Sequence, residues 1–274
     1  MNSTRGRAFI TTLITALAFL GSMLTLQLGG EQSISAAQVA FVSLGAIGTW
    51  FLTCWTLFFK RKAGSLLWIG FFPSLCLIPL ALFAYNVLPG FLSNLESVTF
   101  SLVSTMLFAG YSYLLVLTAN VLNGAVIYNI PLGQAGKASQ FVFSLVSTYL
   151  LLVLMFSTNL HPLIRIAALT FFTTALTLSA TWCLQTYTFK QIRLISIEIG
   201  LTAGLFTLLV SIWPIAGVYG SVVVASIFYM SLNISLEIRE LIRNALWIEY
   251  SVIIMVMILA LFLLGEWGIN GSLL

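Results

Sequence analysis

The sequence has 274 residues, of which 60% are hydrophobic and 7% are charged, whereas soluble globular chains carry about 25% charged residues. A chain this apolar cannot cover itself with polar side chains in water, so its composition excludes a soluble globular fold. The formal net charge of +4 comes from a few basic residues that stand mostly at the ends of apolar runs, so nucleic-acid binding is not expected. We predict an integral membrane protein that contacts the lipid bilayer.

The long apolar runs predict membrane-spanning helices. Lipid cannot satisfy free backbone N–H and C=O groups, which leaves helices and closed β-barrels as solutions. Barrel strands alternate over about ten residues, whereas these runs are continuous and about twenty residues long, as spanning helices require. We therefore predict a single domain, 1–274, folded as an all-α bundle of nine transmembrane helices. The predicted spans are 8–28, 36–59, 66–88, 97–120, 140–156, 162–187, 194–212, 217–236 and 247–264.

The basic residues predict the orientation of these spans. Arg5 and Arg7 precede the first apolar run, a pattern that resembles a signal peptide but that we interpret as the first span. The segment 60–62, Lys-Arg-Lys, follows the second span and should stay in the cytoplasm. With the N-terminus cytoplasmic and the C-terminus outside, Arg165 is the only one of the 11 basic residues on the outer side, which satisfies the positive-inside rule.

The segment 121–139 interrupts the regular alternation of spans and loops. Glycines and Pro131 make it too broken to span, yet Lys137 is its only charge, which is unusual for a free loop. We predict an interfacial or re-entrant segment on the cytoplasmic side, with a well-packed loop as the alternative. Residues that could line a pocket or contact lipid headgroups there are Asn120, Asn123, Tyr128, Asn129 and Gln134.

Several residue types and motifs that membrane enzymes commonly use for catalysis are missing. The sequence has no aspartate and one histidine, His161, which excludes aspartate-rich magnesium sites, HExxH zinc proteases and haem held by two histidines. It also has no glycine-rich phosphate loop and no lysine inside a predicted span. Cys54, Cys76 and Cys183 are in apolar runs without CxxC spacing, so we expect them to pack. We expect no cofactor, no metal and no enzymatic activity.

Two acidic residues in the predicted spans are candidates for a buried charge or a transport pathway. Glu198 is one to two turns inside its span, on the face opposite a seam of small residues that includes Gly200 and Gly204. Glu249 is nearer the surface, and neither acid has a basic residue one helical turn away. An unpartnered acid within a membrane favours a functional role. The alternative is a structural ion pair with an arginine of a neighbouring helix.

The segment 235–250 is strongly charged and joins the last two predicted spans. We predict that it lies on the cytoplasmic membrane surface and docks a protein partner, and the alternative is a solvated extension of a helix. The candidate docking residues are Glu237, Arg239, Glu240 and Arg243.

Three stretches resemble an uncharacterised family of polytopic membrane proteins from uncultured bacteria. They are YLLVLTANVLNG at 113–124, IPLGQAGKA at 130–138 and LEIRELIRNALWIEY at 236–250. In that family an acid often stands where this sequence has Ala119, beside the shared Asn120. The resemblance implies a multi-pass protein of a bacterial cytoplasmic (inner) membrane and no particular chemistry.

Two functions fit these observations. Scarce charge within the spans, an apolar final span and a charged inner segment favour a non-enzymatic subunit or scaffold of a membrane assembly, with protein partners in the membrane. The alternative is a small permease or lipid-handling transporter with its site near Glu198 and 121–139. A transporter needs a hydrated polar cavity near mid-membrane, whereas a scaffold is solidly packed and exposes an apolar lateral face.

Overall fold

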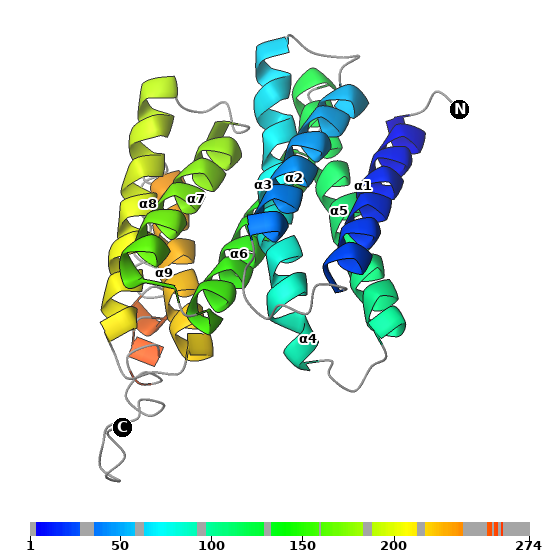
Figure 1. Ribbon diagram of the computed structural model, residues 1–274. Coiled ribbons are helices and arrows are strands. Elements are labelled where there is room, and N and C mark those ends of the chain that lie inside the picture. Colours follow the sequence, from blue (N-terminus) through cyan, green and yellow to red (C-terminus); the bar gives the residue numbers. More distant parts are fainter. Residues whose placement is uncertain are drawn as a thin grey trace.

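The computed structural model describes residues 4–27, 36–57, 63–91, 97–128, 133–158, 160–182, 188–212 and 217–237, together with 251–253, 255–256 and 259. Every secondary-structure element within these residues is a helix, as the apolar runs predict. The elements are α1 (Thr4–Gln27), α2 (Ala36–Leu57), α3 (Ala63–Asn86), α4 (Leu88–Phe91), α5 (Ser97–Tyr128), α6 (Gly133–Ser157), α7 (Pro162–Trp182), α8 (Phe189–Ile212) and α9 (Gly217–Glu237) (Figure 1).

Seven helices of the described part are long and apolar enough to cross a membrane, namely α1 to α3 and α5 to α8. Their apolar stretches have 18 to 26 residues, which at about 1.5 Å per residue match or exceed a hydrocarbon core of about 30 Å. In α9 the corresponding stretch, Val218–Ile234, is shorter. The chain is therefore a multi-pass helical membrane protein. Most of the predicted span 247–264 is outside the described residues, so the count of nine and the orientation of the termini stay predictions.

The helices form two groups around a centre made by α3 and α6. On one side, α1, α2 and α5 pack together, with α2 and α5 against α3, and on the other side α7, α8 and α9 pack together, with α7 and α9 against α6 (Figure 1). Helix α3 also contacts α7, and α6 also contacts α5, so both central helices touch both groups. Fully buried side chains from both groups and from the central helices build the core, among them Cys76, Leu115, Leu152, Leu169 and Ala203.

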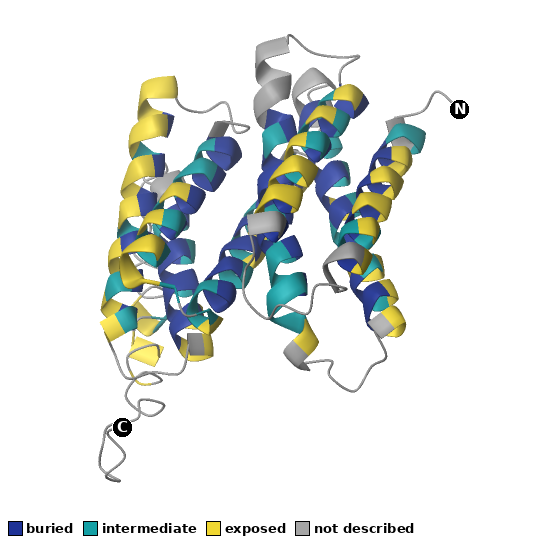
Figure 2. Cartoon of the chain, viewed as in Figure 1, coloured by how far each residue is buried: buried dark blue, intermediate teal, exposed yellow. Residues whose placement is uncertain are grey.

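The outer surface is apolar and the interior contains many hydroxyl groups. Figure 2 shows the exposed residues along the outward faces of the helices, where Phe171 is 77% exposed, as a lipid-facing side chain can be. Inside, buried serine and threonine hydroxyls donate to the carbonyl one turn earlier, as Thr173 does to Leu169 at 2.7 Å and Ser196 does to Ile192 at 2.8 Å. These bonds satisfy the hydroxyls without water, and the small side chains let helices approach closely.

Helices α7 and α8 pack through two buried glycines, Gly200 and Gly204. A Cβ atom at Gly200 would lie 2.8 Å from the carbonyl oxygen of Thr170 and would overlap the hydroxyl of Thr174. A Cβ atom at Gly204 would overlap the hydroxyl of Thr170. The predicted seam of small residues is confirmed, and its partner is α7.

Most of the segment 121–139 belongs to two long helices and is not an element of its own, while its position at the membrane interface stays a prediction. Helix α5 continues to Tyr128 and α6 begins at Gly133, so the two helices take up most of the segment. Gly136 lets them pack closely, because a Cβ atom there would lie 2.9 Å from Cδ2 of Leu122. With 32 residues, α5 is about 48 Å long and exceeds the hydrocarbon core. Packing between the helices thus overrides the low helix propensity of the glycines.

Candidate functional site

Helices α1 and α2 contact each other at the end of the pair where α1 begins and α2 finishes. The hydroxyls of Thr11 and Thr56 are hydrogen-bonded at 2.8 Å. Close by, the guanidinium carbon of Arg7 lies 5.7 Å from the centre of the Trp55 ring, within the range of a cation–π contact. These two contacts close one end of the space between the helices.

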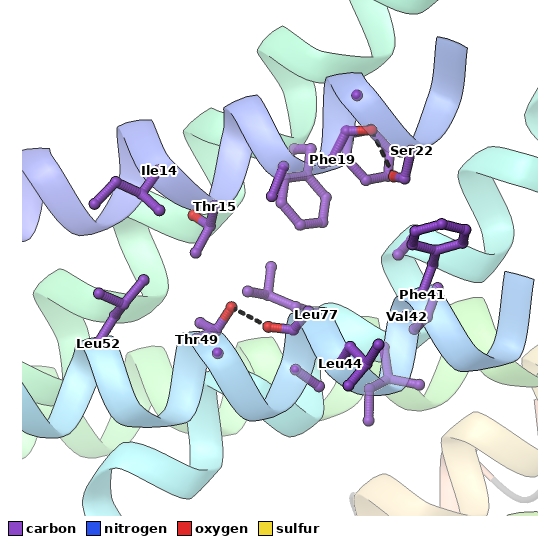
Figure 3. A pocket seen from close by; sticks show the side chains of 18 of the residues that line it. Ile14, Thr15, Phe19, Ser22, Phe41, Val42, Leu44, Thr49, Leu52 and Leu77 are labelled. Carbon is purple, nitrogen blue, oxygen red and sulfur yellow. Dashed lines mark hydrogen bonds between the residues drawn. The ribbon is translucent and has the colours of Figure 1, made fainter. Parts of the chain in front are cut away.

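Further along the pair, α1 and α2 border a cavity of about 540 Å³, a volume typical of small-molecule sites. In Figure 3, Ile14 and Phe19 of α1 face Leu44 and Leu52 of α2 across this space. Helices α3 and α5 supply the remaining walls. The lining residues are Ile14, Thr15, Ala18, Phe19, Gly21, Ser22, Phe41, Val42, Leu44, Gly45, Ala46, Gly48, Thr49, Leu52, Leu77, Ile78, Ala81, Tyr85 and Phe108.

Glycines create the room in this cavity, and its rim faces outward. A Cβ atom at Gly21, Gly45 or Gly48 would meet nothing within 4 Å. Two apolar lining residues, Ile14 and Leu44, are 46% and 66% exposed. They belong to the membrane-crossing stretches of α1 and α2, so the cavity opens sideways toward lipid.

Aromatic rings form the inner wall of the cavity. The rings of Phe19 and Phe108 are stacked, with their centroids 4.1 Å apart and their planes within 1° of parallel. The ring of Tyr85 lies 5.5 Å from that of Phe19. Because Phe19 and Phe108 are buried, this part of the wall is a rigid apolar surface.

The polar groups of the cavity are few and uncharged. Ser22 and Tyr85 are hydrogen-bonded through their hydroxyls, in the last turns of α1 and α3. Thr49 donates to the carbonyl of Gly45 at 2.8 Å. No charged side chain of the described ranges lines the cavity. This is an apolar site with one polar end, and it differs from the hydrated polar cavity that a permease for polar solutes needs.

The side chain of Glu198 is exposed on α8 and is not buried among the described helices, and its role as a buried charge or pathway residue stays a prediction. Helix α8 buries its face with Gly200 and Gly204 against α7, which turns the opposite face outward. The backbone carbonyl of Glu198 accepts a hydrogen bond from Thr202 at 2.8 Å. Glu198 does not line the α1–α2 cavity.

Four of the five polar residues predicted for the segment 121–139 belong to α5 or α6, and neither Asn120 nor Asn123 lines the α1–α2 cavity. Asn123 is buried in α5, and its Oδ1 has no hydrogen-bond partner among the described residues. Asn120 is half-buried in the same helix. Tyr128 is the last residue of α5, and Gln134 is in the first turn of α6. The fifth predicted residue, Asn129, lies outside the described residues.

The charged residues predicted for docking and for a second buried charge are mostly outside the described part of the chain. Glu237 is the last residue of α9. Arg239, Glu240, Arg243 and Glu249 lie outside the described residues, so their roles stay predictions.

Sequence reasoning missed the cavity between α1 and α2. The sequence gives little sign of this cavity. Gly21, Gly45 and Gly48 are glycines in apolar runs, and so are the seam glycines Gly200 and Gly204, so the two groups look alike in the sequence. The first three face open space and the last two face another helix. Only the packing of neighbouring helices separates these two uses of glycine in a membrane span.

The fold and this site define a class: a multi-pass α-helical membrane protein with an apolar cavity that opens sideways. Comparisons with protein-family models, with curated proteins and with solved structures find no match. The resemblance to the polytopic family of uncultured bacteria therefore stays a prediction, and the cavity is the feature that bears on function.

Proposed function

We propose that this protein is a non-enzymatic, lipid-handling membrane protein that takes the apolar chain of a lipid from the bilayer into the α1–α2 cavity. The single observation that carries this proposal is a cavity of about 540 Å³ with an apolar lining and an exposed apolar rim inside the membrane-crossing part of the bundle. A lipid-handling role is the alternative that the sequence left open beside a scaffold, and its proposed site is here α1 and α2 in place of Glu198 and 121–139.

Packing supplies the driving force for such binding. A lipid chain gains nothing from the hydrophobic effect on leaving the bilayer, because lipid tails are as apolar as the cavity. It gains dispersion contacts with walls that no other described part of the chain covers. The stacked rings of Phe19 and Phe108 offer a rigid surface for these contacts, and Gly45 and Gly48 leave the width for a chain.

The length of the cavity matches one leaflet. Its lining residues on α2 run from Phe41 to Leu52, which at about 1.5 Å per residue is about 16 Å, near half of a hydrocarbon core of about 30 Å. The Ser22 end of the cavity is near the finish of α1, so this polar end lies toward the membrane surface on that side, while the lining of α2 spans the middle of the stretch Gln38–Leu57. With the N-terminus in the cytoplasm of a bacterium, as we propose from the basic residues and the family resemblance, this polar end faces the outer surface of the inner membrane.

A scaffold role in a membrane assembly is a second proposal. Large exposed apolar side chains such as Phe171 suit a protein partner as well as lipid, and the segment 235–250 carries the charges for docking. If the role is correct, gentle purification followed by native mass spectrometry yields a stoichiometric companion. The double change Arg239→Ala and Arg243→Ala then weakens its co-purification, and an unchanged yield rejects these residues as the docking site.

Photo-crosslinking tests the lipid-handling proposal. The purified chain is reconstituted into phosphatidylcholine vesicles that contain a long-chain alcohol with a diazirine in its chain, and labelled residues are mapped by mass spectrometry. We expect labelling to concentrate on the cavity residues of α1 and α2. Gly48→Leu fills open space in the cavity and should reduce this labelling, whereas Gly110→Leu, at an exposed position of α5 with nothing within 4 Å, should not.

Two results contradict the proposal. One is labelling of the cavity residues no stronger than that of lipid-facing side chains such as Leu107, which is 58% exposed on α5. The other is cavity labelling that is the same in Gly48→Leu and in Gly110→Leu.

A further inference from the structure

The hydroxyl pair at the polar end of the cavity has a defined direction. A serine hydroxyl has one proton, and that of Ser22 is donated to the carbonyl of Phe19 at 2.7 Å. In the bond between Ser22 and Tyr85, Tyr85 is therefore the donor. Both protons are used within the protein, and the phenol oxygen of Tyr85 keeps lone pairs that can accept a hydrogen bond.

The threonine hydroxyls that line the cavity also donate their protons within the protein. Thr49 donates to the carbonyl of Gly45, and Thr15 bonds to the carbonyls of Thr11 and Thr12 one turn earlier. The cavity thus presents acceptors to a ligand. A ligand with a hydroxyl donor finds a partner at Tyr85, whereas an ether or ketone oxygen finds none.

The described lining of the cavity does not suit an anionic headgroup, because it contains no charged side chain. A phosphate group is normally held by charge-assisted bonds from basic side chains, which these lining residues do not supply.

Like a lipid in a bilayer, the cavity is polar at its end near the membrane surface and apolar at its deeper end. Ser22 and Tyr85 are in the last turns of α1 and α3, toward the membrane surface, whereas Ile14 and Leu52 are at the opposite, deeper end. From this geometry, and resting on the proposed function, we infer that the ligand is a neutral lipid whose polar end is a hydroxyl group, such as a long-chain alcohol, held by donation to the Tyr85 oxygen.

A matched pair of probes tests this inference. The diazirine alcohol used above is compared with its methyl ether, which has the same chain and no donor. We expect the alcohol to label the cavity roughly three- to tenfold more strongly, the preference that one hydrogen bond supplies. Equal labelling by both probes overturns the inference and leaves the lipid-handling function standing. Failure of both probes to label the cavity rejects the function as well.

Two variants identify the group responsible. Tyr85→Phe keeps the ring beside Phe19 and removes the phenol acceptor, so alcohol labelling should fall toward the ether level. Ser22→Ala frees the phenol proton to donate to an ether oxygen, so ether labelling should rise toward the alcohol level. Tyr113→Phe, on α5 outside the cavity, is the control and should keep the preference. A preference that survives Tyr85→Phe overturns the assignment to Tyr85.

Discussion

The change Gly200→Ala should separate α7 from α8 and destabilise the bundle. The new methyl group would lie 2.8 Å from the carbonyl oxygen of Thr170 and would overlap the hydroxyl of Thr174. The hydroxyl can turn away by rotation of its side chain, but the carbonyl belongs to the backbone of α7 and moves only with the helix. Side-chain rotation therefore cannot relieve the overlap with the carbonyl oxygen.

The expected cost follows from two opposing effects. Overpacking of a close-packed site costs about 1–3 kcal/mol, and contact with fixed backbone places Gly200→Ala in the upper part of that range. Alanine returns up to about 1 kcal/mol through its higher helix propensity. The net loss is about 1–2 kcal/mol. At about 2–4 °C per kcal/mol, the melting temperature should fall by about 2–8 °C.

Thermal unfolding in detergent measures this loss, and two further variants sharpen the result. Gly110→Ala, which meets nothing within 4 Å, is the matched control and should not lower the melting temperature. Gly204→Ala collides mainly with the hydroxyl of Thr170, so adding Thr170→Ala should rescue it. Adding Thr174→Ala should not rescue Gly200→Ala, because the Thr170 carbonyl stays in place.

Equal melting temperatures for Gly200→Ala and Gly110→Ala would refute the reasoning, since they would show that α8 does not press against the α7 backbone. Full rescue of Gly200→Ala by Thr174→Ala would also contradict it, because a side chain would then be the only obstacle.

Three further predictions use the same melting assay. Phe19→Ala should cost about 3–5 kcal/mol, because it removes a buried ring stacked on Phe108, and a loss below about 1 kcal/mol would contradict that stacking. Thr11→Val should cost about 0.6 kcal/mol through loss of its bond to Thr56, while Thr11→Ser should restore the native melting temperature. Glu198→Gln should change stability by less than about 0.5 kcal/mol, since the side chain is exposed, and a larger loss would indicate an ion pair that stabilises the bundle.

Much of the helical arrangement was predictable because membrane spans are encoded locally. A run of about twenty apolar residues has one stable backbone conformation in lipid, so the positions of the spans follow from composition alone. The seam at Gly200 and Gly204 was also predictable, since small residues one turn apart on a span are typical of close packing. The boundaries at 121–139 were not, because packing of Leu122 on Gly136 extends the helices through glycines.

The candidate site depended on contacts between segments that are distant in the sequence. Ser22 and Tyr85 are hydrogen-bonded across 63 positions, and no local pattern predicts that pairing. The sequence favoured the acids as candidates because charge is rare in a membrane span. Glu198 nevertheless faces outward, because the glycine seam on the other side of α8 sets the rotation of that helix.

The sequence by itself determined that this is a multi-pass helical membrane protein, because the energetics of burying backbone in lipid act on each segment separately. The tertiary structure alone decided where the helices leave space. Gly48 and Gly200 are the same residue type, but α7 fills the space in front of Gly200, and no helix of the described ranges fills the space in front of Gly48. The cavity is thus a property of how helices pack, which apolar side chains on every face of a span do not specify.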